Sequence, residues 1–464
     1  MTPAARLQAT IELLESIAAT PRAADALTSA YFRARRYMGS KDRAAVSTRL
    51  YTVMRHQARL DWWLERIIER SNSCHPGEGR DPENGPTQTE KAELDSGLRR
   101  NDRLCRLRAL AWMVLGENTA AKTVDELCSG GKFAPAVLSD AERDFLGKID
   151  GGTVEHPDMP DDVRVECPPD VAPILREKFS ANFMREMRAM LEPAPLDLRV
   201  NILKATRDDI LAQLQQAGFR AELCALSPWG VRVFDRPALN ALPMLKEGLV
   251  DIQDEGSQMI AAVVDARPGE RIVDFCAGAC GKTLAIAATM QNTGRIVACD
   301  VMAGRLKAGA ERLRRAGVQN VETRVLSSER DPWVKKHKTS FDRVLVDAPC
   351  GGTGTWRRNP DARWRALGPG LEALVKTQGQ ILDSAARLVR PGGRLIYSTC
   401  SLMPDENENQ IAAFLATHAD FTLEPCGLDG ADYLALTPAK HNTDGFFAAV
   451  MRRANPLADK DKAD

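Results

Sequence analysis

Residues 341–401 decide the fold of this chain. They begin with FDRVLVDAPCG at 341–351 and end with RLIYSTCS at 394–401. Each segment is a short apolar, β-rich run bounded by turn formers, which is typical of a buried strand. Between them, LEALVKTQGQILDSAARL at 371–388 has helical periodicity, and a Pro-Gly-Gly turn at 391–393 follows it. A strand, a helix and a second strand in this order predict a βαβ unit.

A cysteine follows each of the two strands, Cys350 after the first and Cys400 after the second. Open α/β sheets bind ligands beyond the carboxyl ends of their strands, and the βαβ unit brings both of these ends to one side. A single cysteine at such a position is most often structural. Two of them at adjacent strand ends favour covalent chemistry.

The same alternation extends on both sides of this unit. Strand patterns occur at 271–275, 295–299, 321–325 and 445–452, and helical patterns at 282–290, 304–316 and 406–418. We therefore predict an α/β fold, a doubly wound parallel sheet of Rossmann-like type, over residues 251–454. Residues 455–464 are polar and are predicted to form a frayed tail.

The N-terminal part of the chain has a different pattern. Residues 1–146 have helical periodicity, and basic residues alternate with aromatic ones between Tyr31 and Trp63. This mixture suits an RNA backbone with occasional base stacking, although a solvated helix face with core aromatics explains it equally well. Turn formers without hydrophobic period at 71–103 predict a flexible insertion.

Two further regions lie between the helical part and the sheet. The Pro- and Asp-rich segment 147–169 predicts a linker. Residues 170–250 predict a small α+β segment, with strand patterns at 196–201, 230–234 and 249–253. Arg199, Asn201 and Arg305 are candidate RNA contacts, the first two because we expect them on an exposed side of this segment.

Length and composition restrict the class of protein. A chain of 464 residues, 44% of them apolar and 27% charged, predicts a soluble protein of two or three domains. No apolar run approaches the roughly 20 residues that span a bilayer, and the first ten residues lack a secretory leader. The eleven cysteines have no zinc-site spacing. We therefore expect a cytoplasmic protein without a metal or a membrane partner.

The loop CAGACGKT at 276–283 follows the first strand of the sheet. Its small residues let backbone N–H groups approach a ligand closely. Its end resembles a Walker A phosphate loop, but a Walker A has glycine at the position of Cys276. S-adenosylmethionine fits better, because Asp300 at the next strand end can hold ribose hydroxyls, whether or not it also caps a helix. The predicted cofactor-binding residues are Cys276, Ala277, Gly278, Ala279, Cys280, Gly281, Lys282, Asp300 and Asp347.

The cysteine pair suits methylation at C5 of cytosine, a poor nucleophile. A thiolate that adds to C6 makes an enamine whose C5 can accept a methyl group, and loss of the C5 proton then expels the thiol. This chemistry needs an activated cysteine, a group that stabilises charge on the ring, and a base. Asp347, in the same DAPC segment as Cys350, is predicted to hydrogen-bond the N3/N4 edge of the base.

These motifs make the sequence similar to bacterial RNA (cytosine-5)-methyltransferases of the Sun/Fmu type, the small-subunit ribosomal RNA methyltransferase B group. The resemblance covers nearly all of the chain outside the insertion. It includes DRA at 42–44, in a region similar to the NusB fold, and RVN at 199–201, QDEGSQ at 253–258, DAPC at 347–350, TC at 399–400 and GFF at 445–447. It implies a class I methyltransferase sheet, with Cys400 as the nucleophile and Cys350 assisting release of the adduct.

Two positions depart from the family pattern. Cys280 replaces the first glycine of a Gly-Gly pair, so a Cβ would strain the loop or weaken cofactor binding if the backbone there needs positive φ. Gly351 stands where serine or threonine is usual. We expect a monomer that forms 5-methylcytosine in small-subunit ribosomal RNA. The alternatives are the same chemistry on transfer RNA, a non-catalytic RNA-binding assembly factor, and a P-loop ATPase.

Overall fold

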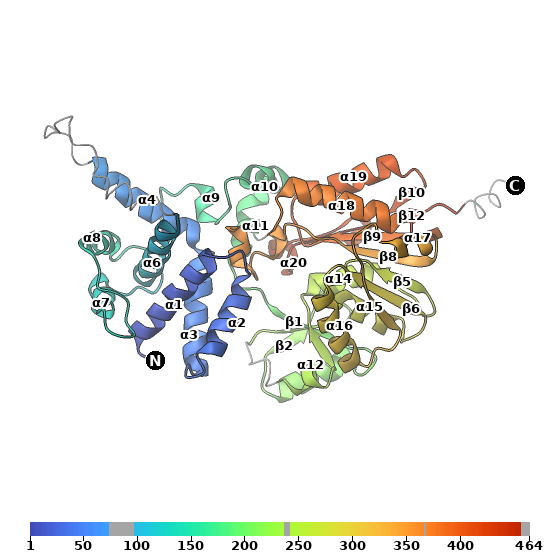
Figure 1. Ribbon diagram of the computed structural model, residues 1–464, viewed down its shortest axis with the longest axis horizontal. Helices are drawn as coiled ribbons and strands as arrows, with labels where there is room; N and C mark the ends of the chain where they lie inside the picture. The colour runs from blue at the N-terminus through green and yellow to red at the C-terminus, as the bar shows by residue number, and fades with distance from the viewer. Residues whose placement is uncertain (74–96, 236–241, 366–367, 456–464) are drawn as a thin grey trace. The chain divides into compact units, whose positions relative to one another are not determined.

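The computed structural model describes residues 1–73, 97–235, 242–365 and 368–455. It divides into two compact units (Figure 1). The first contains Met1–Leu191 and Asn359–Gly368, and the second contains Glu192–Arg358 and Pro369–Asp464. Most of the predicted insertion at 71–103, and all but the first residue of the predicted tail, lie outside the described residues.

The described residues of the first unit form helices. These are α1 (Pro3–Ala18), α2 (Ala24–Ala34), α3 (Ser40–Arg55), α4 (Gln57–Ser73), α6 (Gly97–Leu115), α7 (Ala121–Leu127), α8 (Asp140–Ile149), α9 (Asp161–Arg164), α10 (Ala172–Phe179) and α11 (Phe183–Ala189), with the short 3₁₀ helices η1 (Ser180–Asn182) and η4 (Pro360–Arg363). Leu7, Leu50 and Leu110 are fully buried in one shared core. Since each lies on the apolar stripe of its helix, the helical periodicity correctly predicted an α-helical N-terminal region.

The segment 147–169, predicted as a linker, is packed within the first unit. The Glu166 side chain is fully buried, and its carboxylate accepts hydrogen bonds from the Ala58 backbone N–H at 2.7 Å and from Arg59 Nε at 3.0 Å. Proline and aspartate predict irregular backbone, but they do not prevent a buried ion pair from anchoring that backbone. Helices α10 and α11, which lie in the predicted segment 170–250, are grouped with this unit by their contacts.

The first unit includes a segment that lies much later in the chain. Helix η4 comes after Cys350 in the sequence, yet its contacts are with residues far earlier in the chain. The Asp361 carboxylate accepts a hydrogen bond from the Ala24 backbone N–H at 2.9 Å, and Arg363 donates to the Met190 carbonyl at 3.4 Å. The Asp361 side chain therefore satisfies a backbone donor at the start of α2, which the helix itself leaves without a partner.

The second unit contains a small antiparallel sheet in the order β2-β3-β1-β4. Its elements are β1 (Leu196–Val200), α12 (Arg207–Gln216), β2 (Ala221–Leu223), β3 (Gly230–Val233), α13 (Pro243–Lys246) and β4 (Val250–Ile252). Leu198, Ile210 and Val231 are fully buried between the sheet and α12. The strands predicted at 196–201, 230–234 and 249–253 are thereby confirmed.

The large sheet of the second unit has the order β10-β12-β9-β8-β5-β6-β7, with β11 beside β12. Strands β5 (Arg271–Asp274), β6 (Arg295–Asp300), β7 (Val321–Val325), β8 (Phe341–Asp347) and β9 (Val389–Thr399) are parallel. Strands β10 (Phe421–Glu424), β11 (Leu434–Leu436) and β12 (Phe446–Arg453) pair antiparallel. The predicted Rossmann-like α/β fold is confirmed, although the sequence pattern missed the short strands β10 and β11 and the reversed direction of β12.

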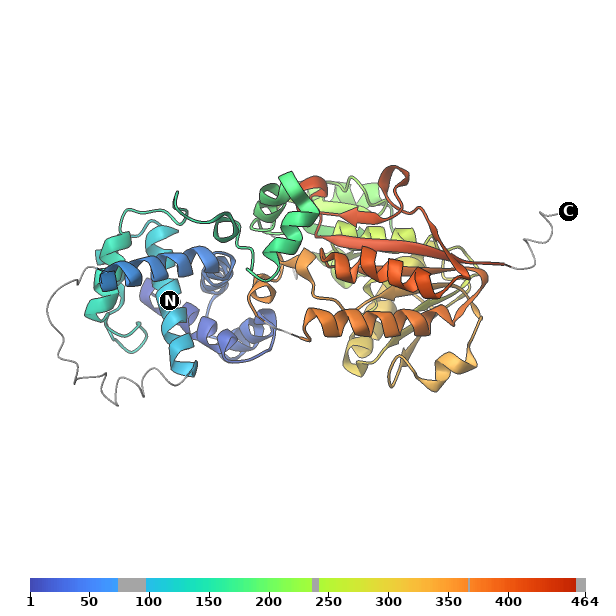
Figure 2. The same cartoon turned by 90° about the horizontal axis from the view of Figure 1, so that it is seen from above.

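Helices cover both faces of this sheet (Figures 1 and 2). Helices α18 (Leu371–Ala386) and α19 (Glu408–Thr417) lie side by side on one face, and α14 (Glu255–Val263), α15 (Gly281–Thr289) and α16 (Ala303–Ala316) cover the other. Leu395 packs toward the first layer and Ile396 toward the second. Successive strand residues point to opposite faces, so burial on both faces explains the continuous apolar runs that the sequence shows.

Short elements complete the second unit. These are α17 (Pro332–Lys336), α20 (Pro438–His441) and the 3₁₀ helices η3 (Thr353–Thr355), η5 (Pro404–Glu406) and η6 (Leu428–Gly430). The parallel strands β5, β6, β8 and β9 all end at one edge of the sheet, at Asp274, Asp300, Asp347 and Thr399. Residues from distant parts of the sequence therefore meet at that edge.

Candidate active site

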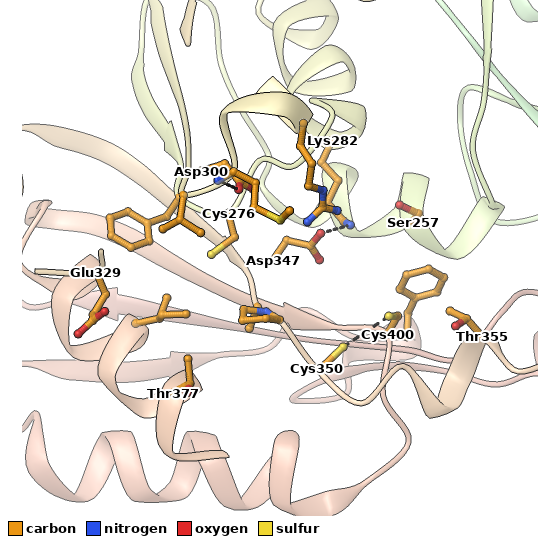
Figure 3. A pocket seen from close by; sticks show the side chains of 18 of the residues that line it. Ser257, Cys276, Lys282, Asp300, Glu329, Asp347, Cys350, Thr355, Thr377 and Cys400 are labelled. Atoms are coloured by element: carbon orange, nitrogen blue, oxygen red, sulfur yellow. Dashed lines mark hydrogen bonds and ion pairs between the residues drawn. The ribbon is translucent and has the colours of Figure 1, made fainter. Parts of the chain in front are cut away.

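A cavity of about 930 Å³ lies beyond these strand ends. Asp300, Asp347, Cys350 and Cys400 are on its wall, and Figure 3 shows their side chains around the shared space. Cys276 and Lys282 also line it, and Ala277, Gly278, Ala279 and Gly281 line a smaller neighbouring pocket that shares several of its residues. The described structure thus brings the predicted catalytic and cofactor residues together, with the exception of Cys280.

The two cysteines face each other, with 3.5 Å between their sulfur atoms. Both thiols are partly exposed and line the cavity. The hydrogen bond to Cys400, together with burial, raises the pKa of Cys350 well above its ordinary value. Cys350 therefore keeps its proton at neutral pH and is placed to donate it to the sulfur of Cys400.

A charged pair lies beside the cysteines. Lys282 Nζ is 2.7 Å from Asp347 Oδ2, and Ser398 donates a hydrogen bond to Asp347 Oδ1 at 3.1 Å. Burial by itself would lower the pKa of Lys282, but the Asp347 carboxylate outweighs burial, so the pKa lies above its ordinary value. The lysine stays charged and holds the carboxylate at the cavity wall.

Asp300 connects the small-residue loop to the end of β6. Its Oδ2 accepts a hydrogen bond from the Gly278 N–H at 2.8 Å, and its Oδ1 accepts one from the Met302 N–H at 2.7 Å. Helix α16 starts at Ala303 with Met302 as its N-cap residue, so Asp300 forms a turn ahead of the helix and does not cap it. Gly278 has φ +53°, which suits glycine in this tight loop.

The cavity wall beside Asp300 has the character that an adenosine group needs. Val301 and Met302 are large apolar side chains that remain 59% and 56% exposed. The Asp300 carboxylate, which is 7% exposed, lies next to them. An acceptor for two ribose hydroxyls beside apolar surface for a purine ring fits S-adenosylmethionine.

Cys280 has the left-handed backbone that the sequence suggested, with φ +60° and ψ +30°. Its fully buried side chain packs against α16, where a Cβ added to Gly309 would lie 2.5 Å from its sulfur. It lines neither the cavity nor the smaller pocket. The strain is therefore present, but the side chain points away from the ligand space, and Gly309 provides the room for it.

The prediction that Arg199 and Asn201 are exposed is wrong. Arg199 is 4% exposed and donates to Gln253 Oε1 at 2.6 Å. Asn201 is 8% exposed, and its Nδ2 donates to the carbonyls of Gly248 at 2.9 Å and Ala316 at 2.8 Å. Buried polar groups need such partners, so the RVN motif joins the small sheet to its neighbours. Arg305, by contrast, is exposed and lines the cavity, and its contact with RNA stays a prediction.

Two residues near the cysteines escaped the sequence reasoning. Arg358 lines the cavity, and its Nη2 is 2.7 Å from the Asp254 carboxylate. Glu406 is fully buried beneath the cysteine loops. Glu406 lies in the acidic run at 404–408, and no local pattern distinguishes a carboxylate that turns inward from one that faces water.

Comparison with known proteins identifies the family. The family model for the 16S rRNA methyltransferase RsmB/F matches residues 261–452, and the model for the ferredoxin-like domain of RsmF/B-like methyltransferases matches residues 174–238. The chain is 31% identical over 422 residues to the ribosomal RNA small subunit methyltransferase B of Sodalis glossinidius, which is 89% of this chain and 90% of that protein. The chain belongs to the family of the ribosomal RNA small-subunit methyltransferases B. Its cofactor is S-adenosylmethionine.

One further relative supports the family, and one solved structure supports the fold. The probable ribosomal RNA small subunit methyltransferase B of Synechocystis is 36% identical over 270 residues, which cover 56% of this chain and 60% of that protein. The crystal structure of PH0851 has a TM-score of 0.77 and covers 98% of this chain and 99% of that one, at 24% identity. Among the described residues, no helix has both the length and the apolar character to cross a membrane.

Proposed function

We propose that this methyltransferase forms 5-methylcytosine in small-subunit ribosomal RNA through a covalent bond between Cys400 and C6 of the target base. The observation that carries the proposal is the pair of thiols 3.5 Å apart at the ends of adjacent parallel strands. One thiol is sufficient for addition to the ring. A second, protonated thiol at this distance is suited to help the bond break again.

The bound cofactor would supply an electrophilic methyl group. Asp300 would accept hydrogen bonds from the ribose hydroxyls, and Val301 and Met302 would contact the adenine ring. The loop at 276–281 would bound the same ligand through its backbone. Two backbone N–H groups already hold the Asp300 carboxylate, so little conformational entropy is lost there when the ligand binds.

Cys400 would act first on the nucleic acid. As its thiolate, it forms a bond to C6 and moves the electrons of the C5–C6 double bond toward C5. Asp347 would accept a hydrogen bond from the N4 amino group of the cytosine and so hold the ring in place, while Lys282 keeps that carboxylate in position. Because a stacked base cannot reach a cavity, the target cytosine has to leave its stack.

Cys350 would act when the product leaves. After C5 has been methylated, a base takes up the C5 proton, and the C5–H electrons restore the double bond as the sulfur of Cys400 departs from C6 with the electrons of the C6–S bond. Cys350 retains its proton and lies beside that sulfur, so it can protonate the departing thiolate. Removal of Cys350 should leave addition intact and slow the release.

The two roles can be tested with labelled S-adenosylmethionine and undermodified small-subunit ribosomal RNA. We expect Cys400→Ala to lose methyl transfer by about a thousandfold or more, because the reaction loses its nucleophile. We expect Cys350→Ala to accumulate protein–RNA adducts that survive denaturation. An active Cys400→Ala variant would contradict the proposal. Unmodified transfer RNA in a parallel reaction distinguishes the two RNA classes, since methylation of transfer RNA alone would assign the alternative substrate.

A further inference from the structure

The short helix η5 lies directly after the Cys400 loop, and its last residue, Glu406, has 0% of its surface exposed. Neither the large cavity nor the smaller pocket has Glu406 on its wall. A buried carboxylate is costly unless hydrogen-bond donors surround it. Glu406 lies next to the active site but does not line the cavity. Its role must therefore be other than contact with substrate.

The Glu406 carboxylate binds the residues that directly follow both cysteines. Its Oε1 accepts a hydrogen bond from the backbone N–H of Gly351 at 2.7 Å. Its Oε2 accepts one from the hydroxyl of Ser401. Gly351 is adjacent to Cys350 and Ser401 is adjacent to Cys400, so a single side chain connects the two loops.

Further contacts hold this carboxylate in place. Gln378 Nε2 donates to Glu406 Oε1 at 3.0 Å and also to the carbonyl of Pro349 at 3.0 Å. The hydroxyl of Tyr397 donates to the backbone carbonyl of Glu406 at 2.7 Å. Gln378 and Tyr397 are both fully buried. The Cys350 loop is therefore held on each side of its cysteine, by Gln378 before it and by Glu406 after it.

We propose that Glu406 is a positioning residue that joins the Cys350 loop to the Cys400 loop and thereby sets the distance between the two sulfur atoms. The catalytic role of Glu406 rests on the proposed two-cysteine mechanism. Its hydrogen bonds to the two loops do not depend on that mechanism. A small displacement of a reacting group from its working position lowers a rate by about 100-fold. Loss of this connection should therefore impair the step that needs both sulfur atoms, which is release of the adduct.

The charge of Glu406 has a second effect on the same step. The hydrogen bond to Cys400 and burial raise the pKa of Cys350, and the nearby Glu406 carboxylate raises it further. Replacement by neutral glutamine should lower the pKa of Cys350 and move the pH profile of adduct release toward lower pH. A side chain that merely filled space would leave that profile unchanged.

The test compares Glu406→Gln with a matched control, Asp405→Asn, in the neighbouring, partly exposed residue. The first readout is oxidation of the free protein by diamide, which takes up two hydrogens as the two thiols become a disulfide. Mass spectrometry of the digested protein then follows the peptide pair that contains Cys350 and Cys400. We expect this bond to form about tenfold more slowly in Glu406→Gln, because the sulfur atoms are no longer held together, and at the wild-type rate in Asp405→Asn.

The second readout is turnover. For Glu406→Gln we expect kcat to fall about 30- to 100-fold with accumulation of adduct, while KM for RNA changes less than about threefold. Wild-type rates of disulfide formation in Glu406→Gln would overturn the proposal. If Glu406→Gln does not fold, Ser401→Ala can replace it, because this variant removes one of the same hydrogen bonds. Disulfide formation at the wild-type rate in Ser401→Ala would also overturn the proposal. The oxidation needs neither RNA nor cofactor, so its result stands even if Cys400→Ala proves active.

Discussion

The cavity is bounded by two kinds of loop that are held in place by different forces. The cofactor loop, residues 275–280, lies between β5 and α15, and the cysteine loops, residues 348–352 and 400–403, follow β8 and β9. In the cofactor loop, Cys280 is buried among apolar residues that include Leu284 and Leu306. The position of Cys280 depends on side-chain volume and backbone conformation, while Asp300 and Arg312 hold its loop neighbours Gly278 and Ala279 by hydrogen bonds.

The cysteine loops are held by buried polar groups. Besides Glu406, the fully buried hydroxyl of Thr399 donates to Asn407 Oδ1 at 2.5 Å, and Asn407 Nδ2 donates to the Ser401 carbonyl at 2.9 Å. Asn407 is 1% exposed. We therefore expect substitutions to disturb the two regions in different ways: the surroundings of Cys280 when side-chain volume changes, and the cysteine loops when charge or hydrogen bonding changes at constant volume.

The largest effect is expected from Asn407→Asp, which keeps volume and changes chemistry. An aspartate there would face the Ser401 carbonyl with an acceptor in place of a donor, so we expect a loss of about 3–5 kcal/mol in the free energy of unfolding near neutral pH. Burial would raise the pKa of the new carboxyl, so the native state would hold its proton and the loss would shrink as pH falls toward 5. Urea denaturation at several pH values measures this. Asn409→Asp, at an exposed position of α19, is the control, because it removes only a surface hydrogen bond to Asp405. A loss below about 1 kcal/mol in Asn407→Asp would contradict the importance of hydrogen bonding in the cysteine loops.

The next effect is expected from Gly309→Ala, which adds volume without polarity. The new Cβ would lie 2.5 Å from the sulfur of Cys280, so we expect overpacking to cost about 1–3 kcal/mol and to weaken S-adenosylmethionine binding through the displaced loop. Thermal denaturation and calorimetric titration of the cofactor measure the two effects. Gly304→Ala in the same helix is the control, since its Cβ meets nothing within 4 Å. If the two variants are equally stable, the packing of Gly309 against Cys280 does not control the stability of the cofactor loop.

Asp274 places an ionisable group at the start of the cofactor loop. Thr283 donates to its Oδ2 at 2.6 Å, and burial raises the pKa of Asp274 to about 7. Because this lies above the unfolded value, the native state binds the extra proton, and stability is lost as pH rises from about 4 to about 7.

We expect Asp274→Asn, which can keep the threonine hydrogen bond, to remove this loss. Between pH 6 and pH 7, the free energy of unfolding of the wild type should fall by about 1 kcal/mol more than that of the variant. Chemical denaturation of both proteins across that range gives the difference. Parallel stability curves would show that Asp274 is ionised throughout.

The smallest effect is expected from Cys280→Gly alone. Release of the left-handed strain gains about 1 kcal/mol, and loss of the buried sulfur costs a similar amount, so stability should stay within about 1 kcal/mol of the wild type. In the Gly309→Ala background the same change should restore most of the lost stability, because the clashing sulfur is gone. A double-mutant cycle measures this coupling. Additive effects would mean that the two residues do not share one packing site.

Sequence patterns alone predict the α/β fold, the helical N-terminal region and the meeting of Cys350, Cys400 and Asp300 at one edge of the sheet. The reason is that these features follow from local periodicity and from a rule of topology: strands buried on both faces are continuously apolar, and the carboxyl ends of parallel strands coincide. The positions of these residues can therefore be predicted without knowing which side chains they contact.

The tertiary structure decided which partners the remaining polar residues have. Arg199 and Asn201 turn inward because carbonyls and amides from distant segments satisfy them, and Glu406 does so because Gly351 and Gln378 supply donors. Cys280 is tolerated because Gly309 on another helix leaves room. Side-chain periodicity gives the face on which a residue lies, but burial of a charged or polar group depends on donors and acceptors far away in sequence, and those come together when the chain folds.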